Sequence, residues 1–72
     1  MKRDKLETLL IQLEACRDKT NEVINSLDDI SSMLDSEKKA NEVREGISDD
    51  STSLVVIACN LQYWCEKLEQ LI

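Results

Sequence analysis

Hydrophobic residues recur every seven positions along the first half of this chain. One series consists of Leu6, Leu13, Leu27 and Leu34, with only Thr20 interrupting it. A second series follows the first by three residues and consists of Leu9, Cys16, Val23 and Ile30. Leu10 and Ile24 widen the resulting stripe. Apolar positions that alternate at intervals of three and four residues lie on one side of an α-helix, so this pattern predicts an amphipathic helix over residues 4–34.

A second stripe begins one residue out of phase with the first. It comprises Ala40, Val43, Ile47, Leu54, Ile57, Leu61, Trp64, Leu68 and Leu71, broken by the polar Asp50 and widened by Ala58, Cys65 and Ile72. Two amphipathic helices joined by a short loop bury their stripes against each other. The sequence therefore predicts an all-α fold, a coiled-coil-like antiparallel helical hairpin that forms a single small domain over residues 1–72.

Two signals disagree about where the chain reverses within residues 35–53. The change of phase near Asp35 and Ser36 favours a turn at 34–36 followed by one long helix. Gly46 suits a helix C-cap, and the Ser, Asp and Thr residues of 48–53 suit the start of another helix. We favour the second reading, with a break at 46–50. It gives helices of about 4–45, with a kink near residue 35, and about 50–71, in which Asp49 and Asp50 serve the N-cap and bind no cation.

The last predicted helix has apolar residues on two sides. Trp64 belongs to the stripe described above, so we expect it to fill the core. Val55, Val56, Cys59 and Tyr63 cluster on nearly the opposite side at helical spacings. Since a helix that is apolar on two sides must be covered on both, these four residues are the predicted partner-binding site.

Composition narrows the possible functions. The 72 residues include no His and one Gly, so the chain lacks the usual proton-transfer side chain and any glycine-rich phosphate loop. We therefore expect no enzyme activity and no cofactor. The formal net charge of -6 disfavours binding to nucleic acid or to anionic membranes. The longest apolar run, residues 54–59, is far shorter than a membrane span, so we expect a soluble cytoplasmic protein.

The cysteines are not expected to stabilise the fold through a disulfide or a bound metal. Their number is odd, and the spacing of Cys16, Cys59 and Cys65 fits no zinc motif, so we expect no metal site and no disulfide framework. We expect all three to be small buried or half-buried side chains in a reducing compartment. A chain of this length gains only about 3 to 5 kcal/mol from its own core. A protein partner is therefore the expected source of additional stability.

The first arm begins LETLLIQLEAC, and the last helix, LVVIACNLQYWCEKLEQL, is dense in aliphatic residues with aromatic residues near its end. In size, acidity and these two segments the chain resembles the small co-chaperones of the type III secretion needle subunit, the YscE, PscE and EscE group. The polar stretch Gly46–Ser53 departs from the resemblance by shortening the expected last helix. The resemblance implies a hetero-oligomer with a helical-repeat (TPR-like) chaperone, which keeps the needle subunit soluble and unpolymerised before export.

A second hypothesis also accounts for the surplus apolar surface. Two hairpins would bury this apolar surface by packing together as a four-helix bundle. The chain would then be a self-associating structural adaptor, and the residues outside the intramolecular stripe would form the contact between copies.

Overall fold

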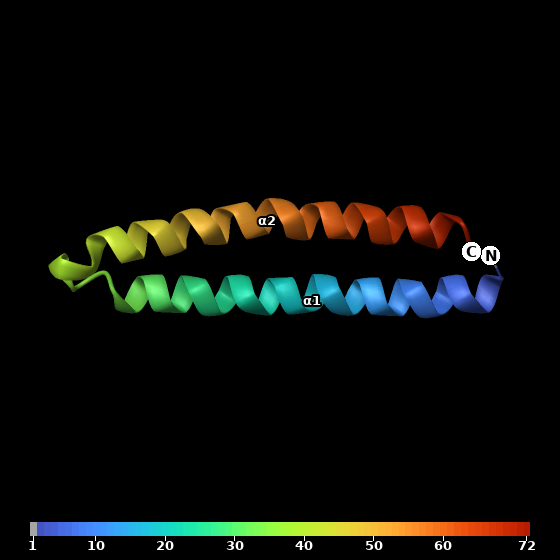
Figure 1. Ribbon diagram of the computed structural model, residues 1–72, viewed down its shortest axis with the longest axis horizontal. Coiled ribbons are helices and arrows are strands. Elements are labelled where there is room, and N and C mark those ends of the chain that lie inside the picture. The colour runs from blue at the N-terminus through green and yellow to red at the C-terminus, as the bar shows by residue number, and fades with distance from the viewer. Residues whose placement is uncertain (1) are drawn as a thin grey trace.

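The computed structural model describes residues 2–72 as two long antiparallel helices (Figure 1). Helix α1 spans Arg3–Met33, the short 3-10 helix η1 spans Lys38–Ala40, and helix α2 spans Asn41–Gln70. The helices lie side by side along their whole length, and the two ends of the chain meet at one end of the rod, whose extents are 55 × 14 × 12 Å. The predicted all-α helical hairpin is confirmed.

The chain reverses at residues 34–40, directly after α1. The amide N–H of Leu34 donates to the carbonyls of Ile30 and Ser31 at 3.1 and 3.2 Å, and the exposed Glu37, Lys38 and Lys39 follow in the turn. The favoured break at 46–50 is therefore wrong, and so are the helix bounds of about 4–45 and 50–71. The change of hydrophobic phase near residue 35 indicated the correct position.

The polar stretch 48–53 is part of helix α2, and two of its hydroxyl groups bond to carbonyls within that helix. Thr52 Oγ1 donates to the carbonyl of Ser48 at 3.1 Å, and Ser53 Oγ donates to that of Asp49 at 3.2 Å. Gly46 has an ordinary helical backbone with negative φ. Asp49 and Asp50 consequently lie in the interior of α2 and cap no helix end. Packing along α1 offsets the low helix propensity of this stretch.

The positions between the two helices follow a strict seven-residue repeat. In α1 and the turn they are Leu6, Leu10, Leu13, Arg17, Thr20, Ile24, Leu27, Ser31 and Leu34, and in the second arm they are Ala40, Arg44, Ile47, Ser51, Leu54, Ala58, Leu61, Cys65, Leu68 and Ile72. Except for Glu14, these are all the buried or half-buried residues of the described chain. The residues expected merely to widen each stripe, Leu10, Ile24, Ala58, Cys65 and Ile72, thus lie between the helices.

Three polar contacts join the helices in a single antiparallel register. Arg17 Nη1 donates to Gln62 Oε1 at 2.7 Å, and Ser51 Oγ donates to Asp28 Oδ1 at 2.7 Å. Near the turn, Arg44 Nη1 lies 3.6 Å from Asp35 Oδ1. A one-residue slip would separate all three pairs, so these contacts help to specify the register along with the apolar pattern.

Candidate protein-binding surfaces

One broad side of the hairpin is lined by apolar residues from both helices. The α1 residues are Leu9, Cys16, Val23 and Ile30, the α2 residues are Val43, Ile57 and Trp64, and Leu71 follows directly after α2. In each helix this series lies one residue before an interface series. Because the helices are both right-handed, antiparallel and facing each other, an equal rotation from the interface brings both series to the same side. We call these eight residues the apolar face.

The apolar face is open to solvent. Trp64 is 56% exposed, Ile57 46%, Val23 48% and Leu71 70%. The expectation that Trp64 fills the core is therefore wrong, as is the assignment of the α1 series to the intramolecular stripe. The contact between two helices is a narrow seam. It therefore cannot enclose a stripe of apolar residues that extends further around either helix.

The opposite broad side is polar except for Val55, and half of its residues are acidic. It presents Glu7, Glu14, Asn21 and Asp28 from α1, Asp35 from the turn, and Asn41, Ser48, Val55, Gln62 and Glu69 from α2. All three polar contacts between the helices involve a residue of this polar face. The hairpin as a whole is thus amphipathic, with a polar side that needs no cover and an apolar side that is left uncovered.

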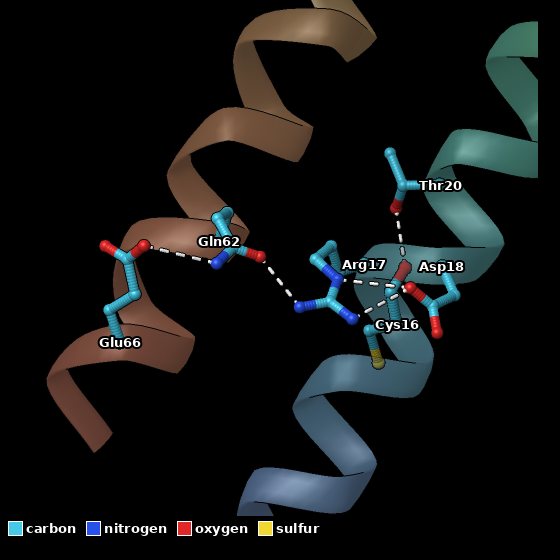
Figure 2. Close-up of polar contacts among 6 residues, drawn as sticks. All are labelled: Cys16, Arg17, Asp18, Thr20, Gln62 and Glu66. Atoms are coloured by element: carbon cyan, nitrogen blue, oxygen red, sulfur yellow. Dashed lines mark hydrogen bonds and ion pairs between the residues drawn. The ribbon is translucent and has the colours of Figure 1, made fainter. Parts of the chain in front are cut away.

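Arg17 links the helices at the edge of the polar face (Figure 2). Its guanidinium donates to Asp18 Oδ1 through Nε at 3.1 Å and reaches across to Gln62, whose Nε2 donates to Glu66 Oε1 at 3.2 Å. The hydrogen bond to Asp18 raises the pKa of Arg17. A charged side chain therefore occupies an interface position without an unsatisfied donor, because its head group lies at the wet edge of the contact.

The predicted partner-binding residues all lie exposed on α2. Val55 is 46% exposed, Val56 58% and Tyr63 49%, and Cys59 is also exposed. Val56 and Tyr63 point away from α1, Cys59 lies between them and the polar face, and Val55 lies on the polar face itself. We call these four residues the outer patch. Their role in binding a partner stays a prediction.

Tyr63 connects the outer patch to the apolar face. Its ring meets that of Trp64 edge to face with centroids 5.0 Å apart, and Lys67 Nζ lies 5.5 Å from the Tyr63 centroid. Such contacts hold the aromatic rings in defined positions on the surface. The two apolar surfaces of α2 are therefore continuous at its C-terminal end.

The cysteines differ in exposure. Cys16 and Cys59 are exposed, whereas Cys65 lies between the helices and is 3% exposed. The expectation that all three are buried or half-buried is therefore correct only for Cys65. Burial raises the pKa of the Cys65 thiol, while the nearby Arg17 acts in the opposite direction.

The described residues present no group of three potential ligands suited to a metal ion, and no pocket opens among them. Neither described α-helix has an apolar segment long enough to cross a bilayer. Compared with known proteins, the chain matches no family model, no curated protein and no solved structure.

The sequence contained a signal for the apolar face that the prediction did not use. Leu9, Cys16, Val23 and Ile30 recur every seven residues, as a surface seam would, but the same spacing also suits a core. Deciding between the two required knowing which side of α1 touches α2.

Proposed function

We propose that this protein is an accessory co-chaperone that acts in the cytoplasm. It binds a larger helical-repeat chaperone, and the pair keeps a type III secretion needle subunit soluble and unpolymerised before export. The chain performs no chemistry in this role. It acts by covering apolar surface on its partner while the partner covers apolar surface on α2, and each protein then stabilises the other by mass action.

One observation carries the proposal. The hairpin contains two helices, and α2 exposes apolar side chains on the side that faces away from α1, where the outer patch lies. Nothing in residues 2–72 covers this side. The resemblance of the two arms to needle-subunit co-chaperones supplies the class of partner.

Co-expression tests this function directly. The chain should co-purify with a helical-repeat chaperone of a type III secretion system and its needle subunit, and should raise the soluble yield of both. Val56→Asp places a charge at the centre of the outer patch and should weaken the complex at least tenfold, since a buried unpaired charge is strongly unfavourable in an interface.

Ser48→Asp provides the matched control. It adds the same charge to the same helix on the polar face, and should leave the complex intact. Equal binding by the wild type and Val56→Asp would show that the outer patch is not the contact. Failure of the wild-type chain to bind or solubilise either protein would contradict the co-chaperone function itself.

A further inference from the structure

The rod-shaped hairpin exposes more surface than a compact monomer of its mass. The chain exposes 5612 Å², whereas a compact monomer of its mass exposes about 4,500 Å². The difference of roughly 1,100 Å² slightly exceeds the area that one protein contributes to a standard stable interface, about 800 Å². The surplus on one hairpin is therefore sufficient for a stable dimer.

The apolar face also has the layered construction of half a four-helix bundle. In the register set by Arg17 and Gln62, its residues from the two helices fall at matching heights, giving the layers Leu9 with Leu71, Cys16 with Trp64, and Val23 with Ile57. Between these series lie the half-buried Leu13, Leu27, Leu54 and Leu61. A second pair of helices that presents the same layers would enclose them all.

The charged residues on this side determine how a second pair of helices is oriented against the first. Asp50 is the single acidic residue in the two series that form the apolar face, and Lys67 lies at its edge, one turn beyond Trp64. Neither forms an ion pair within residues 2–72. Asp50 precedes Cys59 by nine residues and Lys67 follows it by eight. Cys59 lies across from Thr20, near the middle of the hairpin.

Consider two antiparallel hairpins placed face to face and related by a two-fold axis at this midpoint. Asp50 of each copy then lies at the height of Lys67 of the other copy, which gives two equivalent pairs. A parallel arrangement would instead place both copies of Asp50 in one layer with Ile30. The neighbouring edge residues there are Ser26, Met33, Gly46 and Ser53, none of which carries a positive charge. Two carboxylates in an apolar layer without a cation are strongly disfavoured.

We propose that the apolar face binds a second copy of this chain, forming an antiparallel four-helix bundle with symmetric Asp50–Lys67 ion pairs. This surface meets the outer patch only where Tyr63 contacts Trp64, and the inference does not rest on the proposed function. The bundle buries Trp64, the single tryptophan of the chain, so that its fluorescence reports assembly. A partner that requires the apolar face must first separate the two copies.

Light scattering coupled to size exclusion tests the interface. At micromolar concentration the wild-type chain should have twice the mass of one chain, and dilution should shift the Trp64 emission to longer wavelength. Ile57→Asp should yield monomers, whereas Val56→Asp, one residue away on the outer patch, should remain dimeric. A monomeric wild type at all concentrations, or equal effects of the two variants, would overturn the proposal.

Charge exchange tests the arrangement without altering the apolar layers, and it keeps the test valid if Ile57→Asp fails to fold. Asp50→Lys and Lys67→Asp should each weaken the dimer about tenfold, consistent with two surface ion pairs lost together. The double exchange should restore most of the affinity. Dimers whose affinity is unaffected by either single exchange, or not restored in the double variant, would exclude the antiparallel ion pairs.

Discussion

Gly46 lies in the exposed interior of α2, where its small size contributes nothing to packing. A Cβ atom at this position meets nothing within 4 Å, and the backbone does not have positive φ. Gly46→Ala should therefore stabilise the hairpin by about 0.8 kcal/mol through higher helix propensity. Thermal unfolding followed by circular dichroism measures the change. Destabilisation would indicate that Gly46 ends a helix after all, as a C-cap glycine in left-handed conformation does not tolerate a side chain.

The hydrogen bond between Ser51 and Asp28 should make a measurable contribution to stability. Ser51 is 4% exposed, and its hydroxyl donates to the carboxylate across the interface. Ser51→Ala and Asp28→Ala should each lower the free energy of unfolding by about 1 kcal/mol. The double variant should lose little more than either single variant, because both remove the same bond. Fully additive losses in urea denaturation would show that the two residues act independently.

Cys65 should be the least reactive thiol and should give the stability a pH dependence. Burial raises its pKa above the unfolded value of about 8.5, so the folded chain retains a proton that the unfolded chain loses as the pH rises. The free energy of unfolding therefore falls above about pH 8.5. The loss should be smaller in Cys65→Ala, which isolates this thiol from the lysines and Tyr63. In alkylation followed by mass spectrometry, the exposed Cys59 should react before Cys65, and equal rates would contradict the burial of Cys65.

At the scale of the helix, position in the seven-residue repeat should decide the effect of a polar substitution. Ile47 lies between the helices, whereas Val43, one turn earlier, belongs to the apolar face and is 57% exposed. Ile47→Gln should cost about 2 kcal/mol of stability, and Val43→Gln less than about 0.5 kcal/mol. Unfolding in urea at sub-micromolar concentration, followed by Trp64 fluorescence, compares the two. Similar losses of stability for Ile47→Gln and Val43→Gln would mean that both residues contact α1 to a similar extent.

The two helices also differ in what keeps them helical. α1 combines an apolar repeat with good helix formers, so its local and tertiary preferences agree. The first half of α2 contains Gly46 and a run of Ser, Asp and Thr, whose local preference is for a break. We infer that this segment depends most on its contacts with α1, through Ile47, Ser51 and Leu54.

At the scale of the whole molecule, stability should depend on concentration. A two-helix rod of this length has a thin core, in which Ile24, Ser51, Ala58 and Cys65 are the only buried residues among 2–72, so the single hairpin should be marginally stable. If a second copy covers the apolar face, the unfolding midpoint should rise by several degrees over a hundredfold increase in concentration. Calorimetry at several concentrations measures this. A constant midpoint would indicate a self-sufficient monomer.

Much of this architecture follows from the pattern of residues alone. Two amphipathic repeats, few helix breakers and a change of phase near residue 35 lead to a helical hairpin, because helical periodicity is a local property of the chain. The exposure of Val55, Val56, Cys59 and Tyr63 also follows, since they lie off the stripe shared with the other helix.

Two further features were decided only by tertiary structure. The first is the continuity of α2 through residues 46–53, where packing against α1 and the bond from Ser51 to Asp28 outweigh local propensity. The second is the apolar face. A seven-residue repeat fixes which residues share a stripe, but which edge of the stripe touches the other helix depends on how the two helices rotate against each other. That rotation places Leu10, Arg17 and Ile24 between the helices and leaves Val23, Ile57 and Trp64 on the surface.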